Sequence, residues 1–164
     1  MKASGLNMEI FSEGGTGTYN IMPNVPGFTD VQAGSYVFMD AQYLGIGNEQ
    51  GDIFTDFAPA TLITTVLNTH FANRITTDAG AKSLTLNEPG PIVIGEPGFR
   101  YTASSDELGS ISYDTANRTY KVGDKLEIIV PHCDPVVNLH DSFYCVRKDR
   151  VEAVWPVTAR GRSQ

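Results

Sequence analysis

Short runs of β-branched and other apolar residues follow one another along the chain from about residue 55. PATLITTVLNT (59–69) is rich in threonine and branched aliphatic residues, NRITTDAG (73–80) runs into a glycine, and GPIVIGEPG (90–98) is an apolar run between turn residues. Such runs, bounded by Gly, Pro, Asn or Asp, predict strands. Sixteen glycines and nine prolines interrupt the pattern so often that long helices have little room.

Two further segments extend this β pattern toward the C-terminus. VGDKLEIIVPHCD (122–134) places a Gly-Asp turn before an apolar run, and SFYCVRKDRVEAVWPV (142–157) alternates on both sides of Lys148 and Asp149. The second segment predicts a hairpin with its turn at those two residues. We therefore expect a mostly β fold whose C-terminal part, residues 41–164, is a β-sandwich or barrel-like domain.

The first forty residues have a different pattern. MEIFSEGGTGTYNI (8–21) is an apolar run followed by a glycine-rich loop, and TDVQAGSYVFMD (29–40) is a second unit of this kind. Glycines 14, 15 and 17 with Thr16 could present successive backbone N–H groups to a phosphate. The loop lacks both the dinucleotide fingerprint and the Walker spacing, so a tight turn is the competing interpretation.

The stretch VPHCDPVVNLHD (130–141) concentrates two histidines, a cysteine and two aspartates. If it continues the preceding strand, His132 and Asp134 project from one face and Cys133 from the other. One imidazole and one carboxylate form an open site suited to zinc or manganese. Three alternatives stay open: a polar turn at Asp134-Pro135, Cys133 as ligand in place of Asp134, and His140 as a third ligand.

Composition narrows the classes of function. The 164 residues are about one domain's worth of chain, and the net charge of −7 argues against a nucleic-acid partner, which calls for a basic surface. No run of about 18 apolar residues predicts a membrane span, and the N-terminus has no apolar signal-peptide core. Two cysteines do not form a disulfide framework. We expect a cytoplasmic location with no membrane or nucleic-acid partner.

Five segments, in this order, resemble one known family. They are GGTGTY (14–19), VQAGSYVFMD (31–40), DAGAKSL (78–84), VGDKLEIIVPHCDPVVNLHD (122–141) and VEAVWPVTARGR (151–162). The chain resembles the C-terminal part of the metal-activated, pyridoxal-phosphate enzymes that include D-threonine aldolase, D-3-hydroxyaspartate aldolase and eukaryotic-type D-serine dehydratase. These lyases have the alanine racemase fold, a (β/α)8 barrel followed by a β-domain. PHCDPVVNLHD is the most specific of the matching segments.

The resemblance implies a role for each candidate residue. Gly15 and Thr16 are expected to bind the cofactor phosphate through their backbone, with Gly14 and Gly17 shaping the turn. The His-x-Asp pair implies that His132 and Asp134 hold a divalent metal, Mn or Zn, beside the cofactor. The implied substrates are D-β-hydroxy amino acids, which undergo either aldol cleavage or dehydration.

A complete (β/α)8 barrel takes about 200 residues or more, so residues 1–40 are expected to be only its last one or two strand units. The family's cofactor lysine lies on an early barrel strand, and none of the lysines at 2, 82, 121, 125 and 148 matches its context. We therefore assign no catalytic residue here and expect this chain alone to be inactive, as a fragment, a split-enzyme half or a truncated paralogue. Homo-oligomerisation or pairing with the missing barrel would cover the exposed apolar remnant. The alternative is a non-catalytic β-domain used for assembly or metal binding.

Overall fold

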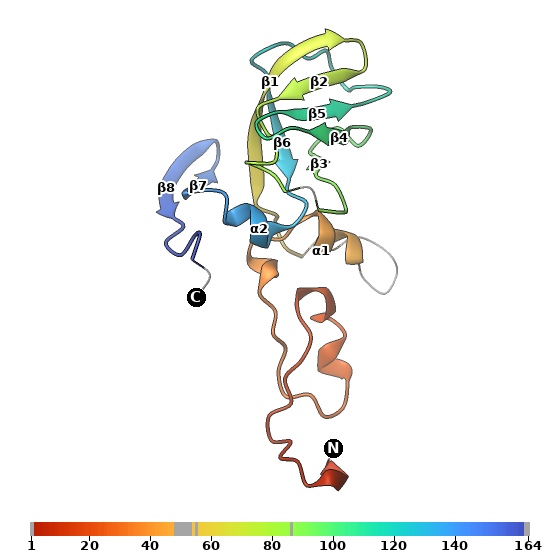
Figure 1. Cartoon of the computed structure of the whole chain (residues 1–164). Helices are drawn as coiled ribbons and strands as arrows, with labels where there is room; N and C mark the ends of the chain where they lie inside the picture. Colours follow the sequence, from red (N-terminus) through yellow and green to blue (C-terminus); the bar gives the residue numbers. More distant parts are fainter. Residues whose placement is uncertain (1, 48–53, 55, 86, 163–164) are drawn as a thin grey trace.

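The computed structural model describes residues 2–47, 54, 56–85 and 87–162. In chain order its helices and strands are α1 (Ala41–Ile46), β1 (Thr61–Phe71), β2 (Arg74–Thr77), β3 (Ile92–Val93), β4 (Arg100–Ser104), β5 (Gly109–Ser112), β6 (Lys125–Ile129), α2 (Cys133–Val137), β7 (Ser142–Arg147) and β8 (Arg150–Pro156). In Figure 1 the N-terminal residues form an arm that extends away from the strands, and α1 and α2 lie between that arm and the sheet.

Six strands form one antiparallel sheet in the order β3-β6-β1-β2-β5-β4. The long strand β1 pairs with β6 through residues 61–65 and with β2 through residues 66–71. A single strand that serves two neighbours in succession bends the sheet, and the result is nearly closed and barrel-like. The prediction of a mostly β, barrel-like C-terminal domain is confirmed, with 29% of residues in strands and 15% in helices.

The strands form where alternate side chains enter one core. In β6, Leu126 and Ile128 are buried while Lys125 and Glu127 are exposed, and in β2 Ile75 is completely buried. This period of two is the signature of a half-buried strand. Among the described residues, the larger of two core clusters contains Val66, Ile75, Ala79, Leu84, Val93, Phe99, Ile111, Tyr120, Leu126, Ile128, Val130, Cys133 and Val136. Cys133 and Val136 belong to α2, so the core directly supports that helix.

The turn after β2 holds β1 in place. The Asp78 carboxylate accepts hydrogen bonds from the Thr64 hydroxyl at 2.5 Å and from the Thr65 backbone N–H at 2.8 Å. Burial raises the pKa of Asp78, but the hydrogen bonds to its carboxylate together lower the pKa by more than burial raises it. The pKa of Asp78 therefore lies below its ordinary value of 3.8. Gly80 follows, and a Cβ atom there would lie 2.5 Å from the backbone of Leu108. Only glycine allows this close approach.

The N-terminal arm contains little regular structure. Short 3₁₀ turns lie at Lys2–Ser4, Thr16–Thr18, Met22–Asn24 and Ser35–Val37, and Ser12 and Asp30 form an isolated parallel bridge. In the described residues, this bridge stands where the sequence predicted barrel strand units. Ile10 and Val37 are exposed, as expected for strands without neighbours, whereas Phe38 packs against the core and stacks on Phe143 at 4.7 Å. The domain boundary at residue 40 stays a prediction.

The predicted C-terminal hairpin is present. Strands β7 and β8 pair antiparallel, with Arg147 opposite Arg150. The two residues between them, Lys148 and Asp149, have φ angles of +49° and +60°. Left-handed conformations at both central residues are typical of the turns that match the twist of a hairpin. Figure 1 shows this hairpin projecting beside α2, apart from the six-stranded sheet.

Candidate metal centre and phosphate loop

The segment that carries His132 and Asp134 leaves the sheet before these residues. Strand β6 ends at Ile129, His132 is the N-cap of α2 with extended backbone angles, and Cys133 and Asp134 lie in its first turn. The strand geometry predicted for residues 132–134 is therefore wrong, because the chain turns at Val130-Pro131 and becomes helical. At this helix start the side chains of residues 132–134 lie on the same side instead of alternating across a sheet.

These side chains converge at the start of α2. His132 Nε2 lies 3.5 Å from Asp134 Oδ2, and Cys133 Sγ lies 3.4 Å from the same oxygen. The Cys133 side chain therefore does not point away from the pair. Burial, the hydrogen bond with Asp40 and the charge of Asp134 together raise the pKa of the Cys133 thiol far above its ordinary value. Without a bound cation these neighbours favour the neutral thiol, whereas the imidazole and the carboxylate are donors without losing a proton.

A fourth residue of this group, Asp40, comes from a distant part of the sequence, the start of α1. It is fully buried at the N-cap of α1, where Oδ1 accepts a hydrogen bond from the Tyr43 backbone N–H at 2.8 Å. Its Oδ2 lies 3.0 Å from His132 Nδ1 and accepts a hydrogen bond from the Cys133 N–H at 2.7 Å. The sequence alone did not predict a role for Asp40. An aspartate directly before the helical run AQYLGI is an N-cap signal, but nothing in the sequence connects it with His132.

The geometry of this group suits a metal ion. One candidate ligand atom from each of Asp40, His132, Cys133 and Asp134 lies within 4.8 Å of the others. Ligand atoms on opposite sides of an ion bound at about 2.0–2.3 Å lie about 4–4.6 Å apart. A nitrogen, a sulfur and two carboxylates are also the donor types that zinc accepts. His140 does not join them, because its Nε2 lies 3.0 Å from the Ser83 carbonyl oxygen.

The glycine-rich loop forms a tight turn that leads into the 3₁₀ turn Thr16–Thr18. Gly14 has a φ of +82°, and a Cβ atom there would lie 2.7 Å from Met22 Cγ. A Cβ atom on Gly17 would lie 2.7 Å from Ile46 Cδ1. A Cβ atom on Gly15 would meet only the Gln32 carbonyl oxygen, at 3.8 Å. Gly14 and Gly17 are thus constrained by their own neighbours, whereas Gly15 has space beside it that the chain itself does not fill.

Hydrogen bonds connect this loop with the start of α2. Thr16 is 2% exposed, and its hydroxyl accepts a hydrogen bond from the Tyr36 backbone N–H at 3.0 Å. The adjacent Ser35 hydroxyl donates to Asp134 Oδ2 at 3.1 Å. The turn Ser35–Val37 therefore contacts the glycine-rich loop through Tyr36 and the candidate metal centre through Ser35. Thr16 uses its hydroxyl within the protein, so a ligand would meet its backbone.

The sequence of the chain matches one known protein family over more than half of its length. The profile of the family described as "Putative serine dehydratase domain" matches residues 60–146, which is more than half of the chain. The chain belongs to this family. The matched region of the serine dehydratase family begins just before β1 and ends in β7, so it contains the whole six-stranded sheet together with α2.

Characterised relatives agree with the resemblance inferred from the sequence. The chain is 37% identical over 165 residues to the 3-hydroxy-D-aspartate aldolase of Paracoccus denitrificans strain Pd 1222, covering 99% of this chain and 42% of that protein. It is 34% identical over 164 residues to a D-threonine aldolase of Arthrobacter, covering 100% of this chain and 43% of that protein. The resemblance to the C-terminal part of these enzymes is confirmed.

The architecture of this member of the serine dehydratase family also matches a solved structure. The D-threonine aldolase from Filomicrobium marinum superimposes with a TM-score of 0.84 at 33% identity, over 98% of this chain and 44% of that one. The fold is that of the C-terminal β-domain of alanine-racemase-fold enzymes. The chain spans less than half the length of each of these relatives.

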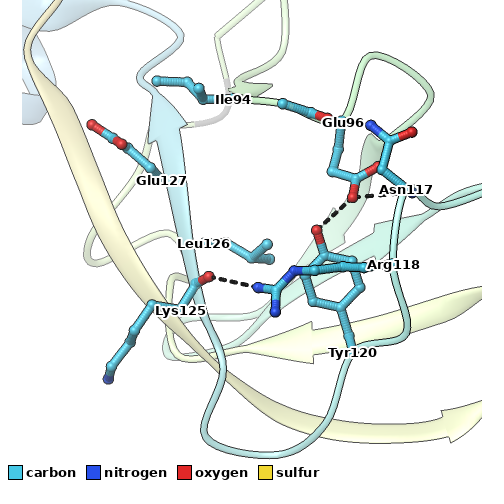
Figure 2. A pocket seen from close by; sticks show the side chains of 9 residues that line it. Ile94, Glu96, Asn117, Arg118, Tyr120, Lys125, Leu126 and Glu127 are labelled. Atoms are coloured by element: carbon cyan, nitrogen blue, oxygen red, sulfur yellow. Dashed lines mark hydrogen bonds between the residues drawn. The ribbon is translucent and has the colours of Figure 1, made fainter.

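A separate hollow of about 370 Å³ lies on the wall of the sheet beside β6. Figure 2 shows Glu96 at its rim, where the buried carboxylate accepts hydrogen bonds from the Tyr120 hydroxyl at 2.6 Å and from the Asn117 backbone N–H at 3.0 Å. Arg118 reaches across the hollow to the Lys125 carbonyl oxygen at 3.5 Å. These polar groups hold the 117–120 segment against β6, so the hollow has a structural explanation.

None of the described helices is long and apolar enough to cross a membrane.

Proposed function

We propose that this chain provides the metal-binding β-domain and the phosphate-binding loop of a pyridoxal-phosphate and divalent-metal-dependent lyase acting on D-β-hydroxy amino acids, of the D-threonine aldolase or D-serine dehydratase type. One observation carries the proposal. The imidazole and carboxylate at the start of α2 are connected through Ser35 and Tyr36 to the glycine-rich loop. The proposed metal site and the proposed phosphate site therefore lie in one hydrogen-bonded network.

His132 and Asp134 are the proposed metal ligands. Nδ1 of His132 is engaged with Asp40, so Nε2 faces the ion. The Asp134 side chain is 62% exposed and can adjust to the ion at little cost. A bound divalent ion polarises an oxygen of the substrate. One nitrogen and one oxygen donor suit Mn or Zn, and the ion's positive charge would favour Cys133 as an additional thiolate ligand, which would shift the preference toward Zn.

Gly15 and Thr16 are the proposed phosphate contacts, in a cofactor-binding loop whose turn Gly14 and Gly17 shape. Gly15 has no Cβ to block the approach of a ligand, and its neighbour Thr16 begins the 3₁₀ turn Thr16–Thr18. Backbone N–H groups at such a turn attract an anion. The cofactor, once bound, withdraws electrons from the substrate's Cα. The role of this chain is to anchor the phosphate and to place the metal near the substrate hydroxyl.

The covalent attachment of the cofactor is assigned to a lysine outside this chain. Lys82 is exposed and forms an ion pair with Glu107 at 2.5 Å, and Lys125 donates to the Thr65 hydroxyl at 2.6 Å. Lys125 lies in β6 and Lys82 lies in the turn that follows β2, and each is engaged with a neighbouring side chain. We expect the chain alone to be inactive and to need a (β/α)8 barrel that supplies this lysine.

The phosphate site can be tested without the missing lysine. Pyridoxine 5′-phosphate has no aldehyde and cannot react with surface lysines, and pyridoxine is the matched compound without phosphate. Amide NMR shifts at Gly15 and Thr16 should respond to the first compound and not to the second. Gly15→Ala should weaken the response, whereas Gly34→Ala, whose Cβ would meet nothing within 4 Å, should leave it unchanged.

Two results would contradict the proposal. Equal amide shift changes with pyridoxine and with its phosphate would show that the loop does not bind the phosphate group. A folded chain that binds neither pyridoxine 5′-phosphate nor Mn²⁺ nor Zn²⁺ would favour a non-catalytic β-domain instead.

A further inference from the structure

We infer that Asp40 is a positioning residue that fixes the tautomer and the orientation of His132 for metal binding. The inference rests on the proposed function, in which His132 is a metal ligand, but the tautomer itself can be measured without a metal. Asp40 lies 92 residues before His132 and belongs to a different element, the N-cap of α1.

The hydrogen bonds around Asp40 determine the tautomer. Its Oδ1 accepts from the Tyr43 N–H, and its Oδ2 accepts from the Cys133 N–H and contacts His132 Nδ1 at 3.0 Å. An ionised carboxylate only accepts hydrogen bonds. His132 must therefore carry its proton on Nδ1, which leaves the Nε2 lone pair free. Nε2 is the nitrogen that faces Asp134, at 3.5 Å from Oδ2.

Burial gives this carboxylate a second relation to the metal. Asp40 is 0% exposed, and a buried negative charge is costly unless a positive charge or several hydrogen bonds compensate it. Among the ion pairs of the described residues, its only partner is His132. A cation bound at Nε2 would place a positive charge on the far side of the same imidazole. Asp40 and the ion would then stabilise each other through His132, an arrangement that raises the basicity of a ligating histidine.

Asp40 also connects the two proposed subsites. It caps α1, and Gly17 of the glycine-rich loop packs against the Tyr43 and Ile46 side chains of that helix. The Tyr43 ring lies 6.0 Å from the His132 ring. A change at Asp40 therefore reaches the metal ligand directly and the loop through α1.

Asparagine is the sharpest substitution at this position. It keeps the size of the side chain but replaces one acceptor oxygen by an NH₂ donor. If the NH₂ takes the place of Oδ2, it opposes the Cys133 N–H and must donate to His132 Nδ1, which moves the histidine proton to Nε2. If the amide is flipped, the NH₂ opposes the Tyr43 N–H instead. In the first orientation the histidine proton occupies the nitrogen that would bind the metal, and in either orientation one backbone N–H loses its acceptor, so Asp40→Asn weakens the hold on His132.

The first measurement uses ¹⁵N-labelled, metal-free wild-type protein at about pH 8.5, about two units above the ordinary histidine pKa of 6.5. Long-range ¹H–¹⁵N correlation should place the His132 proton on Nδ1. A proton on Nε2 in the folded wild type would overturn the inference. This experiment needs no variant, so it remains decisive if Asp40→Asn fails to fold.

The second measurement compares Asp40→Asn with wild type by calorimetric titration of Zn²⁺ and by the same NMR experiment. We expect metal affinity to fall by about 10- to 100-fold, the range for losing a partner of a ligating histidine, with the His132 proton moving to Nε2. Asp78→Asn is the matched control, because Asp78 also accepts hydrogen bonds from a side chain and a backbone N–H but lies outside the cluster. It should keep wild-type affinity.

The outcomes separate this inference from the proposed function. Wild-type affinity in a folded Asp40→Asn variant whose His132 proton has moved to Nε2, or in a folded Asp40→Ala variant that has no acceptor at this position, would overturn the role of Asp40 alone. A wild-type protein with its proton on Nδ1 that binds no Zn²⁺ or Mn²⁺ would support the positioning of His132 and contradict the metal site of the proposed function.

Discussion

Replacing His132 by alanine should damage the chain in two separable ways, whereas replacing Asp134 by alanine should damage it in only one. His132 contacts the fully buried Asp40 carboxylate at 3.0 Å. A hydrogen bond to a charged group contributes about 1.5–3 kcal/mol, and two backbone N–H donors still hold Asp40 after the change. We therefore expect His132→Ala to lower the free energy of unfolding by about 1.5–3 kcal/mol without any metal.

Asp134 has a different environment. Its side chain is 62% exposed, and its described side-chain partners include the Ser35 hydroxyl at 3.1 Å. Surface substitutions of this kind usually change stability by less than about 0.5 kcal/mol. In EDTA, thermal unfolding followed by circular dichroism should place His132→Ala about 3–12 °C below wild type, at about 2–4 °C per kcal/mol. Asp134→Ala should stay within about 2 °C.

The same two variants should behave alike once metal is added. Zn²⁺ at about 100 times its dissociation constant should stabilise the wild type by about 2.7 kcal/mol, and neither variant should gain this increment. His140→Ala is the control, because that imidazole contacts the Ser83 carbonyl outside the cluster, and it should keep the metal response. The reasoning would be refuted if Asp134→Ala lost as much stability in EDTA as His132→Ala, or if either variant responded to Zn²⁺ like the wild type.

Three further predictions concern the framework of the site. Gly80→Ala should destabilise the chain by about 3 kcal/mol in urea unfolding, because its Cβ would lie 2.5 Å from the Leu108 backbone. Gly90→Ala, whose Cβ would meet nothing within 4 Å, should cost less than about 1 kcal/mol. Similar losses of stability in the two variants would contradict the close approach at Gly80. Gly14→Ala should cost about 1–3 kcal/mol because φ is +82°, and an unchanged unfolding midpoint would argue against this turn. Because the pKa of Asp78 is lowered in the folded chain, its carboxylate contributes to folding stability above pH 3.8, and this contribution is lost as the pH falls through the lower folded pKa. The difference in unfolding free energy between wild type and Asp78→Asn should therefore shrink in acid. A difference that stays constant with pH would contradict this prediction.

The sequence predicted β1, β2, β3 and β6 because local patterns determine them, but it did not predict β4 and β5. Alternation in residues 125–129 and the turn at Lys148-Asp149 are both short-range signals, and both elements are present. The same reasoning failed at His132, where the strand was extended through Pro131 into what is the start of a helix. Only five residues of α2 are helical, too few for a hydrophobic period to be recognised.

The arrangement of the site depends on contacts between distant residues. Asp40 and His132 are 92 positions apart, and Ser35 and Asp134 are 99 apart. No local propensity encodes such pairs, so the pattern could suggest His132 and Asp134 but not the carboxylate that orients the histidine. The resemblance to a family supplied the roles of the two motifs, and the structure added the hydrogen bonds that connect them.

Anomalous diffraction from crystals of this chain grown with Zn²⁺, measured at the zinc absorption edge, tests the central claim most directly. The account predicts a peak at the start of α2, about 2.0–2.2 Å from His132 Nε2 and from a carboxylate oxygen of Asp134, with Asp40 on the Nδ1 side of the imidazole. An ordered α2 with no peak there, or with zinc bound only elsewhere on the chain, would contradict the metal centre and the lyase function proposed from it.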